Sequence, residues 1–127
     1  MAGSKTILFV EDDRIISEMY ARQLTREGYA VEFAYDGQSG LEMAQTKAYD
    51  LILLDIMMPT LSGIDVLHQL RGRDQTGAGA TKIIVLTNLA QDATSQEALR
   101  SAADGYIIKA DVVPSQLAQL VKGILPA

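Results

Sequence analysis

Short runs of apolar residues recur along the chain and predict strands that are buried on both faces. Each run lacks the alternation of a half-exposed strand, which is typical of parallel strands covered by helices on both sides. A further segment, Ala30–Ala34, alternates around Glu32 and predicts a strand at the edge of the sheet. The four apolar runs are Ile7–Val10, Leu51–Leu54, Ile83–Leu86 and Tyr106–Ile108.

Helical periodicity follows each predicted strand. Apolar positions three and four residues apart predict a first helix that stops at Gly28 and a last helix that opens at Pro114. The segment from Asp92 to Ala103 has Leu99 as its single large apolar anchor, so we expect this fourth helix to be the least firmly packed. The other predicted apolar faces are Ile16, Met19, Tyr20 and Leu24; Leu41, Ala44 and Ala48; Ile64, Leu67 and Leu70; and Leu117, Leu120, Val121, Ile124 and Leu125. Strands that alternate with helices indicate an α/β fold with one parallel sheet and helices on both faces.

Composition narrows the classes of protein that fit this pattern. The 127 residues suit a single domain, 1–127, with its core at about residues 5–125. A net charge of −5 and a pI near 4.7 argue against a nucleic-acid-binding domain. Cysteine is absent, and no apolar run approaches the roughly 20 residues that cross a membrane. We therefore expect a cytoplasmic domain that binds neither nucleic acid nor membrane.

The ends of the predicted strands carry the candidate chemistry, because ligands of open parallel sheets bind at the carboxyl ends of the strands. The first strand runs into Glu11-Asp12-Asp13, and the strand at Leu51–Leu54 ends in Asp55. The next two strands end in Thr87 and Lys109. Several carboxylates, one hydroxyl and one ammonium group are thus predicted to share one edge of the sheet.

The carboxylates point to a bound cation. If the first and third strands are neighbours, Asp12 and Asp55 lie close together with Glu11 beside them. Two such charges 4 Å apart repel by about 4 kcal/mol at an effective dielectric of 20, so the site holds a proton or a cation. An oxygen-rich site with room for water suits Mg²⁺. We expect Asp13 instead to cap the following helix.

The hydroxyl and the ammonium group fit phosphoryl transfer. A cation and Lys109 would neutralise phosphoryl oxygens, and Thr87 would donate a hydrogen bond to one of them. Asp55 is then the candidate nucleophile, because carboxylates accept phosphoryl groups as aspartyl phosphates.

At these positions the sequence resembles the response-regulator receiver domains of two-component signalling, the chemotaxis-regulator-like family. The resemblance implies a flavodoxin-like fold, with a five-stranded parallel sheet in the order 2-1-3-4-5 and five helices on both faces. It extends from Thr6 to Leu125 and rests on the motifs Phe9-Val10-Glu11-Asp12-Asp13, Leu53-Leu54-Asp55-Ile56-Met57-Met58-Pro59 with Gly63, Val85-Leu86-Thr87 and Gly105-Tyr106-Ile107-Ile108-Lys109.

The resemblance implies a phosphoprotein that takes part in a phosphorelay. A sensor histidine kinase or a histidine phosphotransfer protein would phosphorylate Asp55. The protein's share of the Mg²⁺ site would be Glu11, Asp12, Asp55 and the backbone carbonyl of Met57.

The resemblance also implies how the phosphoryl group would act. Thr87 and Lys109 would contact it, and Tyr106 would change position when Thr87 moves inward. The surface of the fourth helix, fifth strand and fifth helix would then bind a downstream protein or a tethered effector, and a homodimer formed on phosphorylation is left open. The domain would not be an enzyme beyond catalysing its own phosphorylation and slow dephosphorylation.

Two departures from the family pattern lie near the expected pocket. Ala110 follows Lys109 where the family usually has a cis proline, so we expect a trans bond there and a differently shaped loop. Asn88 stands where the family has a small residue and should narrow access to the pocket. Leu89 and Met57 cannot orient a water molecule, so we expect a long-lived phosphorylated state.

Two other classes of protein remain as alternatives. A dehalogenase-like phosphatase would carry an Asp-x-Asp pair after its first strand, whereas the acids here are contiguous. A receiver-like interaction module that is never phosphorylated would be expected to lack Asp55, Thr87 or Lys109, and the chain retains all three.

Overall fold

The described strands form one parallel sheet in the order β2-β1-β3-β4-β5 in the computed structural model of the chain. The structure describes residues 5–55, 66, 69, 81–87, 105–108 and 113–125, without the side chains of residues 87, 105, 106 and 108. The predicted strand order is therefore confirmed, with the Ala30–Ala34 strand at an edge. The strands are β1 (Thr6–Val10), β2 (Ala30–Ala34), β3 (Leu51–Asp55), β4 (Lys82–Thr87) and β5 (Gly105–Ile108).

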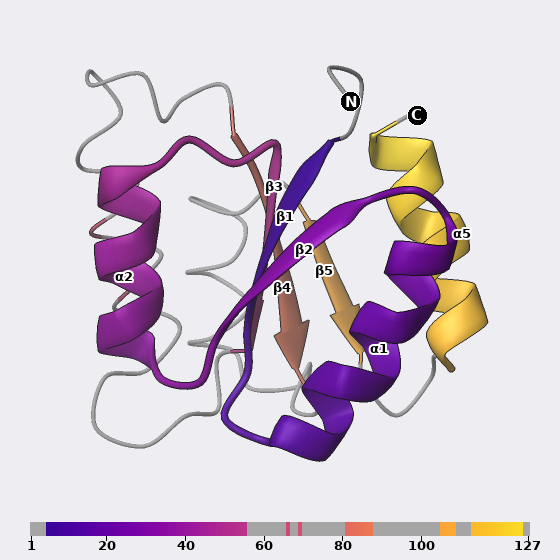
Figure 1. The fold of residues 1–127 in the computed structure, drawn as a ribbon, viewed down its shortest axis with the longest axis horizontal. Coiled ribbons are helices and arrows are strands. Elements are labelled where there is room, and N and C mark those ends of the chain that lie inside the picture. The colour runs from indigo at the N-terminus through magenta and orange to yellow at the C-terminus, as the bar shows by residue number, and fades with distance from the viewer. Residues whose placement is uncertain are drawn as a thin grey trace.

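Three of the predicted helices lie within the described residues and cover both faces of the sheet. Helix α2 (Gly37–Thr46) lies on one face, while α1 (Arg14–Arg26) and α5 (Pro114–Ile124) lie together on the other (Figure 1). Pro114 occupies the first turn of α5 as predicted, and Gly28 follows α1 with a φ of 100°, a conformation that favours glycine.

The remaining two predicted helices are described at isolated positions or not at all. Val66 and Gln69 of the third have helical backbone, and Val66 is buried. The fourth, from Asp92 to Ala103, lies outside the described residues.

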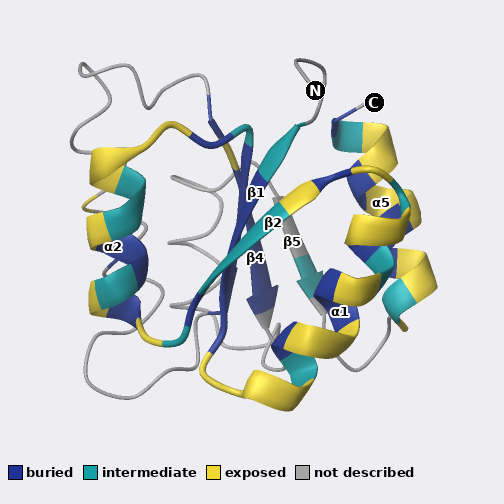
Figure 2. Cartoon of the chain, viewed as in Figure 1, coloured by how far each residue is buried: buried dark blue, intermediate teal, exposed yellow. Residues whose placement is uncertain are grey.

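The apolar strands divide their side chains between two hydrophobic clusters, one on each face of the sheet. This division follows from the alternation of side chains along a strand, and it explains why the strand sequences are apolar without a break. The central strands β1 and β4 are largely buried between the helices (Figure 2). Leu8, Val10, Ile52, Leu54, Ile83 and Val85 pack on the side that includes Leu41 of α2. Ile7, Phe9, Leu51, Leu53, Ile84 and Leu86 pack on the side that includes Leu24 of α1 and Leu117 of α5.

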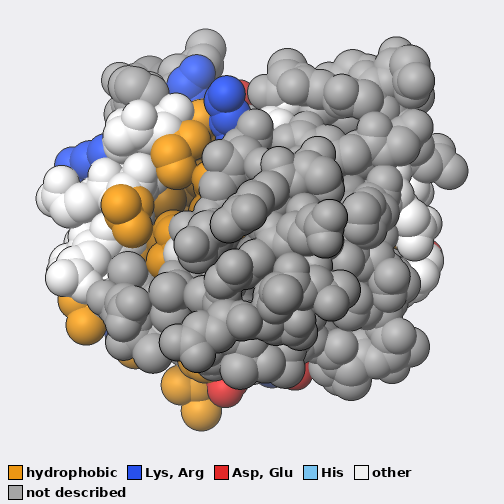
Figure 3. All heavy atoms as spheres, turned by 180° about the vertical axis from the view of Figure 1, so that it is seen from behind, with side chains coloured by type: hydrophobic (Ala, Val, Ile, Leu, Met, Phe, Trp, Pro, Cys, Tyr) orange, Lys and Arg blue, Asp and Glu red, His pale blue; other side chains and the backbone are white. Residues whose placement is uncertain are grey.

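Three residues of the predicted helix faces were placed wrongly. Met19 and Leu120 are each 45% exposed, and Ala48 lies beyond the end of α2. The buried residues of α1 are Ser17, Tyr20, Ala21 and Leu24, so Tyr20 and Leu24 are confirmed, Ile16 is partly buried, and Ser17 and Ala21 were not predicted. Seen from behind, hydrophobic side chains are exposed on the side of the molecule where α5 lies (Figure 3).

No helix among the described residues is long and apolar enough to cross a membrane.

Candidate functional site

The acidic residues predicted to form the site follow two central, adjacent strands. β1 pairs in parallel with β3, with Val10 opposite Leu54. Glu11 comes directly after β1, and Asp55 is the last residue of β3. The two buried strands thus deliver their acids to the same edge of the sheet.

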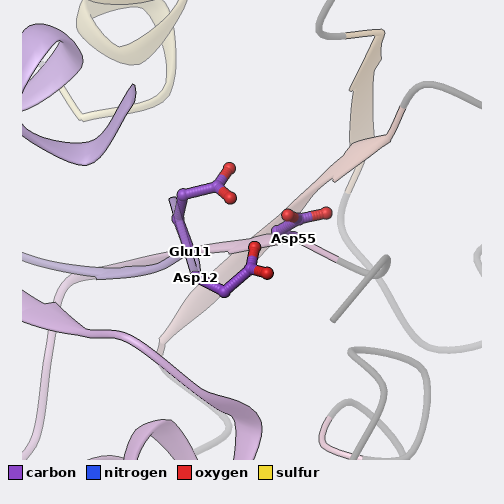
Figure 4. A group of neighbouring side chains, drawn as sticks. All are labelled: Glu11, Asp12 and Asp55. Carbon is purple, nitrogen blue, oxygen red and sulfur yellow. The ribbon is translucent and has the colours of Figure 1, made fainter. Parts of the chain in front are cut away.

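The carboxylates of Glu11, Asp12 and Asp55 come together at this edge. Each of the three side chains has an oxygen within 4.8 Å of the others'. Figure 4 shows the three labelled side chains gathered in one place. Glu11 and Asp55 are 1% and 2% exposed, whereas Asp12 is exposed to solvent. The predicted convergence of these residues is therefore confirmed.

Backbone hydrogen bonds fix the loop that carries Glu11 and Asp12. The N–H of Glu11 donates to the carbonyl of Ala34 at 3.0 Å, which ties the loop to the edge strand. The Asp13 N–H donates to the Glu11 carboxylate at 3.2 Å. The loop therefore sets the direction of the Glu11 side chain.

Asp13 has the capping role predicted for it. Its carboxylate accepts hydrogen bonds from the N–H groups of Ile15 at 2.9 Å and Ile16 at 3.1 Å. These donors lie in the first turn of α1 and have no partner within the helix. Asp13 therefore caps α1, whereas Glu11 and Asp12 belong to the acidic cluster with Asp55.

The donor set of the site fits Mg²⁺. Hard divalent cations prefer carboxylate oxygens, and Mg²⁺ commonly binds through one or two carboxylates while it keeps several waters. Glu11, Asp12 and Asp55 provide such oxygens, and exposed Asp12 leaves one side of the cluster open to solvent.

The other predicted site residues are placed only in part. Thr87 ends β4, which pairs with β3, and Tyr106 lies in β5 opposite Val85. The backbone thus brings both residues into strands on the β4–β5 side of Asp55, but their side chains are not described. The predictions for Met57, Asn88, Leu89, Lys109 and the Lys109–Ala110 bond lie outside the described residues.

Two residues that contact β1 or the loop after it were not predicted from the sequence. Ser17 is completely buried, and its hydroxyl donates to the carbonyls of Asp13 at 3.0 Å and Glu11 at 3.4 Å. Gly40 of α2 packs so closely on β1 that a Cβ there would lie 2.8 Å from a methyl group of Val10. A polar residue at a helical core position was the available signal for Ser17, since buried hydroxyls need hydrogen-bond partners.

Comparison with known families identifies the class of domain that this fold and site define. The response regulator receiver domain family matches residues 7–122, so the chain belongs to that family. Response regulator ArlR of Staphylococcus saprophyticus is 37% identical over 114 residues, which make up 90% of this chain and 50% of that protein. The chain thus spans about half the length of the curated relatives it matches.

Solved structures agree with this membership. The chemotaxis protein CheY4 of Vibrio cholerae superposes with a TM-score of 0.84 at 27% identity, covering 97% of this chain and 100% of CheY4. The response regulator TrrA of Thermotoga maritima, solved in complex with Mg²⁺–BeF, gives a TM-score of 0.78 at 33% identity, covering 95% of this chain and 99% of TrrA.

Proposed function

We propose that this domain is a Mg²⁺-dependent phosphoryl-accepting switch in which Asp55 is the acceptor. The observation that carries the proposal is the position of Asp55, nearly buried at the end of a central strand with the carboxylates of Glu11 and Asp12 beside it. Membership of the receiver family supports the same role. The similar fold of TrrA was solved in complex with Mg²⁺–BeF, which supports a role for Mg²⁺ here as well.

The acceptor chemistry follows from the acidic cluster. A carboxylate oxygen of Asp55 forms a bond to phosphorus, while the bond from phosphorus to the donor's imidazole nitrogen breaks and that nitrogen keeps the electron pair. Bound Mg²⁺ would offset the negative charge that the phosphoryl group adds to three carboxylates. Glu11 and Asp12, together with the Met57 carbonyl, would hold the cation, and Thr87 and Lys109 would contact the phosphoryl oxygens.

Membership of the receiver family suggests both the phosphoryl donor and the surface that binds a downstream partner. A sensor histidine kinase or a histidine phosphotransfer protein would supply the phosphoryl group. Thr87 and Tyr106 would then change the surface formed by the predicted fourth helix, β5 and α5, which would bind a downstream protein or a tethered effector. In this account the domain is a switch and not an enzyme that acts on a separate substrate.

Intact-mass measurement tests the proposal. We would incubate the wild type and Asp55→Asn with a small acyl-phosphate donor, or with a phosphorylated histidine kinase, in Mg²⁺ and in EDTA. The proposal predicts a gain of one phosphoryl group in the wild type with Mg²⁺, and no gain in EDTA or in Asp55→Asn. Asp36→Asn is the matched control, because asparagine also caps helices and Asp36 lies at the start of α2.

The same experiment separates the alternative function. A folded wild type that gains no phosphoryl group from any donor would favour an interaction module that is never phosphorylated. A gain that persists in Asp55→Asn would place the acceptor elsewhere and would also overturn the proposal.

A further inference from the structure

The inner face of α1 connects the first helix directly to the acidic loop through one serine. Ser17 is completely buried on the face of α1 that packs against the sheet, although serine is more often exposed. Its hydroxyl donates to the carbonyls of Asp13 and Glu11. A hydroxyl has a single hydrogen to donate, so these two carbonyls share it.

The partners of Ser17 are both parts of the loop that presents the acidic residues. The Asp13 carbonyl also accepts the first helical hydrogen bond, from the N–H of Ser17 at 3.0 Å. The Glu11 carbonyl belongs to the peptide unit that leads into Asp12. Rotation of this peptide would change the directions of both neighbouring side chains, so the Ser17 hydroxyl opposes the motion that would separate the two carboxylates.

We infer that Ser17 is a positioning residue for the cation site, holding the Glu11–Asp12 peptide so that the carboxylates of Glu11, Asp12 and Asp55 converge. This inference rests on the proposed function, because it concerns the Mg²⁺ site of that function. Ser17 touches neither cation nor phosphoryl group in this account. It acts through the backbone of Glu11, in the way that residues behind metal ligands set ligand geometry.

The inference distinguishes Ser17 from an ordinary packing residue. An alanine at this position keeps the Cβ contacts and removes only the hydroxyl. If the role of Ser17 were purely structural, Ser17→Ala would lower the stability of the fold without changing the affinity for the cation. A positioning serine also has to change the affinity of the folded protein for Mg²⁺. Calorimetric titration with Mg²⁺, carried out well below the melting temperature, measures that affinity without any phosphoryl transfer.

The experiment compares Ser17→Ala with Ser39→Ala in the full chain. Ser39 also lies in the first turn of a helix and donates its hydroxyl to a neighbour, Asp36. It belongs to α2, and its hydrogen bonds within the described residues go to Asp36 and not to the acidic loop. We expect Ser17→Ala to weaken Mg²⁺ binding about tenfold, the lower end of the effect of positioning residues in metal sites. Ser39→Ala should bind Mg²⁺ as the wild type does.

A second variant keeps the test decisive if Ser17→Ala does not fold. Ser17→Cys retains a side chain of similar shape with a weaker donor, so its Mg²⁺ affinity should fall between those of the wild type and the alanine variant. Folded Ser17 variants that bind Mg²⁺ as tightly as the wild type would overturn the inference and leave the proposed function intact. A wild type that binds no Mg²⁺ would instead overturn the proposed site and the inference with it.

Discussion

The two ends of the sheet place their carboxylates in opposite surroundings. At the carboxyl ends of β1 and β3, Glu11, Asp12 and Asp55 bring three groups of the same charge within 4.8 Å of one another. At the amino end, the Asp50 carboxylate accepts from the N–H of Thr6 at 2.8 Å and from its hydroxyl at 3.2 Å. The carboxyl end therefore gathers three acidic groups, whereas the Asp50 carboxylate at the amino end is held by the backbone and side chain of Thr6.

A second acid outside the acidic cluster, Glu32 in the middle of the edge strand β2, also has partners within the fold. Glu32 of β2 accepts from the ammonium group of Lys47 and from the hydroxyl of Tyr49, the latter at 2.8 Å. The hydrogen bond from Lys47 lowers the pKa of Glu32 below its ordinary value, and the Tyr49 hydrogen bond acts in the same direction. Asp50 and Glu32 thus have partners that stabilise the fold as it stands, whereas the acidic cluster is suited to a cation.

Loss of Asp50 should have the largest effect on stability. Asp50→Ala leaves the Thr6 N–H without its carboxylate acceptor, so we expect a loss of about 1–3 kcal/mol in the free energy of unfolding. Mg²⁺ affinity should not change, because the residue lies at the opposite end of β3. Urea unfolding and Mg²⁺ titration of the same variant measure both quantities. A clear loss of Mg²⁺ affinity in a folded Asp50→Ala variant would contradict the division between the two ends.

Neutralising one acid of the cluster should raise the free energy of unfolding, the opposite of the effect of Asp50→Ala. In EDTA, Asp12→Asn removes one of three like charges while keeping the side-chain shape, so the free energy of unfolding should rise by about 0.5–1 kcal/mol. Added Mg²⁺ should stabilise the wild type more than the variant. Urea unfolding in EDTA and in Mg²⁺ tests both expectations, with Asp36→Asn as the control. A variant less stable than the wild type in EDTA would show that repulsion does not dominate the cluster.

The last prediction concerns alkaline pH. Burial raises the pKa of Tyr49 from 10.0 to about 12, with the hydrogen bond to Glu32 acting in the same direction. A raised pKa means that the folded state favours the neutral phenol. The resulting stability is fully present below pH 10 and is lost as the pH rises toward 12.

Replacement of the phenol isolates this contribution. Between pH 10 and pH 12, the melting temperature of Tyr49→Phe should decrease less steeply than that of the wild type. The two proteins should differ in stability by a constant amount below pH 10, where the phenol is neutral in both the folded and the unfolded states. If the melting temperatures of the two proteins followed parallel curves across the whole pH range, a raised pKa of Tyr49 would be ruled out.

The sequence predicted the features that depend on local chemistry. Unbroken apolar runs located the strands, because a strand buried on both faces has no polar side, and the alternation at Glu32 located the edge strand. Asp13 was correctly separated from Asp12 because capping is decided within one turn. The convergence of Glu11 and Asp55 also followed, once their strands were taken as neighbours.

The features that were missed depend on contacts between elements. Met19 and Leu120 have the spacing of buried residues but lie at the borders of their helix faces, where the neighbouring element decides exposure. Ser17 is buried because two backbone carbonyls accept from its hydroxyl, and hydrophobicity alone gives no sign of this. The tight approach of Gly40 to Val10 likewise appears only when α2 is packed on β1.

The most direct test of the central proposal locates the phosphoryl group on the chain. Borohydride reduces an acyl phosphate to an alcohol, and peptide sequencing by mass spectrometry then identifies the residue that carried it. After incubation with a phosphodonor and Mg²⁺, the reduced residue should be Asp55, and no reduced residue should be found in EDTA. Reduction at Glu11, Asp12 or any other carboxylate, or at none with every donor, would contradict the assignment of Asp55 as the acceptor.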